Sequence, residues 1–79
     1  MIRIDARGLE PPEPFERTME ALCELQPGDE ILLIIDREPR PLYRVLDRNG
    51  YAWQSTYHDD GRFEVVIRPR AGARSPKRR

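Results

Sequence analysis

The chain has 79 residues, about the length of one small domain, and 38% of them are hydrophobic while 35% are charged. The longest uninterrupted apolar run, residues 31–35, is far shorter than the roughly 20 residues that cross a bilayer, which excludes a membrane-spanning helix. The formal net charge is zero, yet residues 1–67 hold eight arginines against 14 acidic residues, a net −6, and the remaining residues hold only basic charges.

The first half of the chain alternates strand and helix. Ile2 and Ile4 alternate with polar residues, which predicts a strand over residues 2–5. A helix is expected over about residues 12–25, because prolines suit a first helical turn and apolar residues then recur at helical spacing. That spacing places three side chains in the core: Phe15, Met19 and Leu22. The apolar run of residues 31–35, bounded by acids, favours a strand inside a sheet.

The second half predicts one more helix and a hairpin. A second proline-marked start indicates a short helix over about residues 39–48. Strands over residues 51–57 and 63–67 flank a three-residue loop at Asp59-Asp60-Gly61. The loop length fixes the parity, which pairs Tyr57 with Phe63, Ser55 with Val65 and Trp53 with Ile67 and places Trp53 and Tyr57 on the core side.

This order, β-α-β-α-β-β, predicts an α+β fold. Right-handed crossovers place both helices on one face of a four-stranded mixed sheet, which makes a two-layer α/β sandwich. Leu32 and Ile34 then point to the uncovered face. Either long arginine side chains shield them, or that face binds a partner or a second copy of the chain.

The domain is expected to cover residues 1–68 and a basic disordered tail residues 69–79, because the tail has no large apolar residue. The tail has no aromatic residue to stack on a base, and the acidic domain repels polyanions, so nucleic acid is not an expected partner. A single cysteine and an N-terminus without a signal peptide's apolar stretch predict a cytoplasmic protein.

Residues 5–14, Asp-Ala-Arg-Gly-Leu-Glu-Pro-Pro-Glu-Pro, resemble the D-x-R-G-L-x-C-P-x-P signature of the TusA/SirA-like sulfur carriers. In that family the cysteine carries a persulfide, and the carriers dock onto larger proteins. Here its position is Pro11, so the resemblance implies the fold and a protein partner but not the sulfur chemistry. With residues 36–43 and 50–53, the chain is more similar to an uncharacterised bacterial domain family beside the carriers.

Other candidates for chemistry have simpler interpretations. Cys23 lies late in the first helix at the edge of its apolar stripe, and a half-buried structural cysteine is expected; a persulfide carrier that uses Cys23 is the alternative function. His58 with Asp59 and Asp60 is interpreted as a polar hairpin end rather than a metal site. No motif of an enzyme, metal centre or cofactor site is present, so we expect a non-catalytic TusA-like accessory or protein-binding module.

The candidate binding edge lies where the two predicted parallel strands meet the following helices. It combines six residues: Arg7, Pro11, Glu13, Asp36, Arg37 and Arg40. The arginines near the helix starts could bind a small anion or a protein partner. The alternative is ionic locking of the two loops, with Arg7 paired to Asp36 and Arg37 or Arg40 paired to Glu13 or Glu38.

Overall fold

The computed structural model describes residues 1–70. Its elements follow the predicted order: β1 (Ile2–Asp5), α1 (Glu13–Glu24), β2 (Ile31–Ile35), α2 (Arg40–Arg48), β3 (Tyr51–Tyr57) and β4 (Phe63–Pro69). β4 ends at Pro69, two residues later than predicted, and Arg70 still donates its N–H to the Gly50 carbonyl at 2.8 Å. The rest of the predicted tail, residues 71–79, lies outside the described residues. Neither described helix has the length or the apolar content to cross a membrane.

The four strands form one mixed sheet in the order β1-β2-β4-β3. β1 runs parallel to β2, while β4 is antiparallel to both β2 and β3. The hairpin has the predicted register, with Tyr57 opposite Phe63, Ser55 opposite Val65 and Trp53 opposite Ile67. The mixed sheet is therefore confirmed, and so is the three-residue loop, because the His58 N–H donates to the Arg62 carbonyl at 2.9 Å and leaves residues 59–61 between them.

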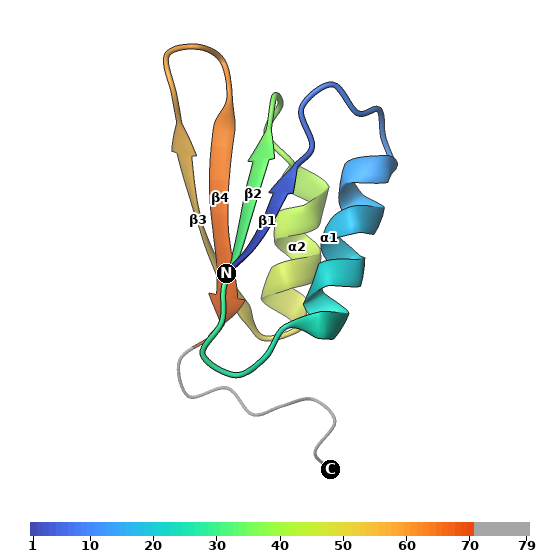
Figure 1. Cartoon of the computed structure of the whole chain (residues 1–79), viewed down its shortest axis with the longest axis vertical. Coiled ribbons are helices and arrows are strands. Elements are labelled where there is room, and N and C mark those ends of the chain that lie inside the picture. Colours follow the sequence, from blue (N-terminus) through green and yellow to red (C-terminus); the bar gives the residue numbers. More distant parts are fainter. Residues whose placement is uncertain (71–79) are drawn as a thin grey trace.

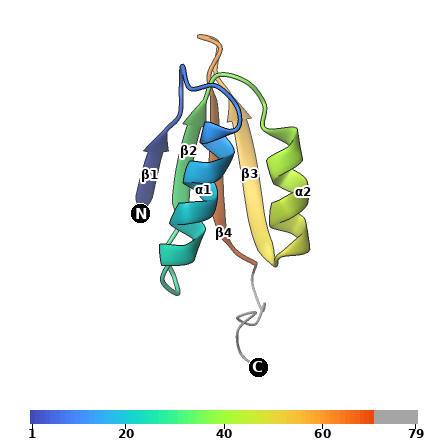
Figure 2. The same ribbon diagram turned by 90° about the vertical axis from the view of Figure 1, so that its right-hand side faces the viewer.

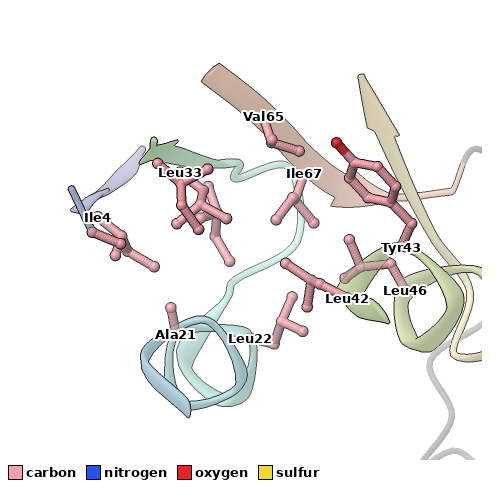
Figure 3. Packing of buried hydrophobic residues seen from close by; sticks show 12 residues of the cluster. Ile4, Ala21, Leu22, Leu33, Leu42, Tyr43, Leu46, Val65 and Ile67 are labelled. Atoms are coloured by element: carbon pink, nitrogen blue, oxygen red, sulfur yellow. The ribbon is translucent and has the colours of Figure 1, made fainter. Parts of the chain in front are cut away.

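Both helices cover the same face of the sheet (Figures 1 and 2). The core lies between the layers, where side chains of β2, β4 and the two helices meet (Figure 3). Its largest fully buried apolar side chains are Ile31, Leu33, Leu46, Val65 and Ile67. Trp53 stacks flat on Tyr43 with 3.7 Å between ring centroids, which confirms its packing role.

Helix α1 is rotated relative to the predicted stripe. Thr18, Ala21 and Leu22 are its buried residues, and the Thr18 hydroxyl donates to the Pro14 carbonyl at 2.9 Å. Phe15 was expected in the core but is 37% exposed, because the small side chains of Thr18 and Ala21 face the sheet instead. Tyr57 is likewise 60% exposed: it ends β3, beside the hairpin loop, and tilts against Phe63.

On the uncovered sheet face, ion pairs lie beside Ile34. Ile34 is only 3% exposed although it is not part of the core cluster between the layers. Its neighbours on the flanking strands are Asp5 and Glu64, which pair with Arg7 and with His58 and Arg62. Charged side chains therefore border Ile34 on this face, whereas Leu32 is half-buried; the paired arginines belong to the loops and not to the neighbouring strands.

Two leucines on opposite faces of β2 test this arrangement. We expect Leu33→Ala to lower the free energy of unfolding by about 2–5 kcal/mol, because Leu33 is fully buried between the layers. The matched control Leu32→Ala should cost less, since Leu32 is half-buried on the opposite face. Urea denaturation followed by circular dichroism measures both. Equal losses in the two variants would contradict the two-layer arrangement.

Candidate functional site

The loops that follow β1 and β2 leave the sheet at the same edge, because the two strands are parallel (Figure 1). The Ala6 N–H donates to the Ile34 carbonyl at 2.7 Å and extends the strand pairing past Asp5. The Gly8 N–H then donates to Asp36 Oδ2 at 3.0 Å. Gly8 has φ +81°, a conformation that other residues rarely adopt, so this contact between the loops depends on glycine.

Between these loops lies a pocket of about 180 Å³, which we call the proline pocket. One wall comes from the β1–α1 loop and the start of α1, the other from the end of β2, its loop and the start of α2. Its lining is mainly apolar: Leu9, Pro11, Pro12, Pro14, Phe15, Leu33, Ile35, Asp36, Arg37, Glu38, Pro39, Pro41 and Leu42. Such a cavity has the size of one aromatic ring or branched aliphatic side chain.

The starts of both helices border the proline pocket. Neither helix has a side-chain hydrogen bond that caps its N-terminus, and one of the first two residues of each helix is a proline. The first turn of α1 contains Glu13 and Glu16, whereas the first turn of α2 contains no acidic residue. The α2 side of the pocket is therefore the side where the helix dipole favours a negative group.

Most charged side chains near the pocket already have partners. Asp36 accepts the Gly8 N–H. Glu38 lies 3.2 Å from Arg40 Nε and accepts the Tyr43 hydroxyl at 3.4 Å, and burial raises the pKa of that hydroxyl. Arg37 is exposed and, within residues 1–70, has no ion pair or side-chain hydrogen bond. Among residues 1–70 it is the one cation on the pocket lining.

The structure brings together half of the predicted site. Pro11, Asp36 and Arg37 line the proline pocket, whereas Arg7, Glu13 and Arg40 do not. Glu13 pairs with Arg17 along α1 at 3.2 Å, and Arg40 pairs with Glu38. The predicted group of three arginines at the helix starts is therefore not formed.

Arg7 pairs with Asp5 rather than with Asp36. Arg7 Nη2 lies 2.7 Å from Asp5 Oδ2, and Nε lies 2.9 Å from Oδ1. These hydrogen bonds hold the pKa of the Asp5 carboxyl well below its usual range. Ionic locking is thus observed at this edge, but the predicted pairing of Arg7 with Asp36 is wrong, because Asp5 is two residues away and Asp36 is held by a backbone N–H.

The pocket itself was not predicted. Its sequence signal is a pair of proline clusters, residues 11–14 and 39–41, that follow two parallel strands. Prolines were interpreted only as helix starts, and Phe15 only as a core residue. Because parallel strands place their following loops at one edge, two apolar clusters in those loops favour a shared apolar surface.

Cys23 lies away from this site. It is exposed near the C-terminal end of α1, so the prediction of a half-buried cysteine is wrong. At 100° per residue, Cys23 points about 140° away from Thr18 at the centre of the buried face. His58 contacts Glu64 at 3.0 Å, and residues 1–70 contain no group of three or more metal-ligating side chains that could hold an ion.

Comparison with known proteins gives one matching family and two similar proteins. The family described as "Uncharacterized conserved protein (DUF2249)" matches residues 3–69. A Methanocaldococcus jannaschii protein named "Putative sulfur carrier protein" is 31% identical over 70 residues, which cover 86% of this chain and 93% of that protein. The crystal structure of a SirA-like protein from Desulfitobacterium hafniense matches with a TM-score of 0.77 and 33% identity, over 85% of this chain and 95% of that one.

The Arg7–Asp5 pair predicts a specific acid sensitivity. A lowered folded-state pKa stabilises the fold above the ordinary aspartate pKa of about 4, and this contribution is lost as the pH falls through the folded-state value. Arg7→Gln removes the guanidinium that lowers the pKa of Asp5. The difference in unfolding free energy between wild type and Arg7→Gln should therefore shrink below about pH 4 in urea titrations. A constant difference from pH 6 to pH 2.5, or the same trend in Arg44→Gln, would contradict it.

Proposed function

This chain belongs to the DUF2249 family of uncharacterized conserved proteins, and from that membership we propose that it is a non-catalytic, protein-binding module of the SirA-like fold. Its binding site is the proline pocket. The partner inserts one apolar side chain between the two loops, and no sulfur atom is transferred.

One observation supports this proposal above the others. Pro11 occupies the position of the cysteine in the sulfur-carrier signature, and its side chain lines the pocket. Proline has no nucleophile, no N–H and a fixed φ, so it cannot hold a persulfide but can form a rigid apolar wall. The same edge of the fold is thereby suited to packing instead of to thiol chemistry.

A persulfide carrier that uses Cys23 is the alternative, favoured by the relationship to a named sulfur carrier. The position of Cys23 argues against it. It lies ten residues from the start of α1, about 15 Å along the helix axis. The positive end of a helix dipole, which stabilises a thiolate, is the opposite end. Two acidic residues also lie near Cys23 on the helix, Glu20 three residues before it and Glu24 directly after it.

Sulfur loading separates the two functions. After incubation with a cysteine desulfurase and cysteine, wild type should show no added sulfur by intact-mass measurement. Pro11→Cys should gain a persulfide, because it restores a thiol at a helix N-terminus. An adduct on wild type that disappears in Cys23→Ala would establish the alternative and reject the proposal.

Photo-crosslinking tests for a protein partner at the pocket. A photoreactive phenylalanine analogue at position 15 should give one discrete crosslinked species in cells that express the protein, because Phe15 lines the pocket and is 37% exposed. The same analogue at Cys23, exposed at the other end of α1, is the matched control. Equal crosslinking from both positions, or none from position 15, would contradict a partner at this site.

A further inference from the structure

We infer that the proline pocket binds the carboxy-terminal residue of a protein chain, with the apolar side chain inside the pocket and the terminal carboxylate on Arg37. This inference rests on the proposed function and names the group that the partner supplies. It follows from three features of the pocket: its size, the state of its charges and the helix start beside it.

The size of the pocket selects the side chain. A volume of about 180 Å³ admits one leucine, isoleucine or phenylalanine side chain. The pocket is lined by Leu33 and Ile35 of β2, by Phe15 and by the prolines that follow β1 and β2. The buried base formed by Leu33, Ile35 and Leu42 rejects a charged side chain, which would lose its hydration there without a partner.

The charges select the second group of the ligand. Asp36 and Glu38 line the pocket beside Arg37 and accept hydrogen bonds from Gly8 N–H and from Tyr43 and Arg40, and among residues 1–70 neither pairs with Arg37. Arg37 has no ion partner within residues 1–70, and its guanidinium has a fork of donors that fits a carboxylate. An apolar residue that ends in a carboxylate supplies both groups within one residue.

The start of α2 adds to this selection. Neither helix has a side-chain cap, but the first turn of α1 contains Glu13 and Glu16 whereas that of α2 contains no acidic residue. A carboxylate on the α2 side of the pocket therefore meets the positive end of a helix dipole as well as Arg37. Of the acidic residues, Glu38 on the lining is paired with Arg40 and Asp36 on the lining accepts the Gly8 N–H, while salt screens those that lie more than about 8 Å away.

The test uses a short peptide in two forms, acetyl-Ala-Ala-Phe with a free carboxylate and the same peptide as the carboxamide. Amide chemical shifts of the full chain are followed by NMR during each titration. Wild type should bind the acid about tenfold more tightly than the amide, the scale of one charge-assisted hydrogen bond. The largest shifts should come from Gly8, Phe15 and Arg37.

Variants separate this inference from the proposed function. Arg37→Gln should lose most of the preference for the acid, retain only the part that the α2 dipole contributes, and bind the amide with the wild-type affinity. Arg44→Gln, an exposed arginine of α2 outside the pocket, should keep the tenfold preference. Phe15→Glu should bind neither form, and its unchanged folding is checked by circular dichroism.

Each other outcome has one meaning. If wild type binds the acid and the amide equally and Phe15→Glu binds neither, the ligand's carboxylate is not recognised. The inference is then rejected, and the pocket remains a site for an apolar side chain. Binding of 3-phenylpropionate as tightly as the peptide acid would reject a protein chain as the source, in favour of a small aromatic acid. Absence of all binding, together with absence of crosslinking from position 15, would reject the inference and the proposed function together.

Discussion

The parallel pairing of β1 with β2 is the constraint on which the site depends. It brings the segment after Asp5 and the segment after Ile35 to one edge of the sheet, although about 30 residues separate them. The hydrogen bond from Ala6 N–H to the Ile34 carbonyl continues this pairing, and the bond from Gly8 N–H to Asp36 extends it into the loops. An antiparallel β1 would place Pro11 and Pro39 at opposite ends of the sheet, and no pocket could form between them.

A two-layer domain of this size must also close the sheet face that no helix covers. Here short-range ion pairs border one end of that face, with Asp5 and Glu64 on either side of Ile34, while Leu32 stays half-buried. Asp5 pairs with Arg7, and Glu64 pairs with Arg62. Arg40 is likewise held by Glu38. Structural pairing thus engages several of the arginines near the loops, and on the pocket lining it leaves Arg37 available to a ligand.

The fold followed from the sequence more completely than the site did. Periodicity and loop length were sufficient for the element order and for the pairing of Tyr57 with Phe63. The rotation of α1 was not predictable from a hydrophobic stripe, because the small residues Thr18 and Ala21 approach the sheet most closely and contribute little to such a stripe. Of the ion pairs expected at this edge, Arg40 with Glu38 is present, whereas Arg7 with Asp36 is not. Arg7 binds a carboxylate two residues away, since a local contact orders less chain than one between loops.

Replacement of a cysteine by a proline changes more than the reactive atom. A thiol at a helix start acts through charge and needs an open, polar approach for its partner enzyme. Proline rings in both loops instead form apolar walls whose backbone is already restricted, so little conformational entropy is lost when a ligand enters. The SirA-like fold brings these two loops together in either case. The residues placed on the loops, and not the fold, therefore decide whether this edge transfers an atom or holds a side chain.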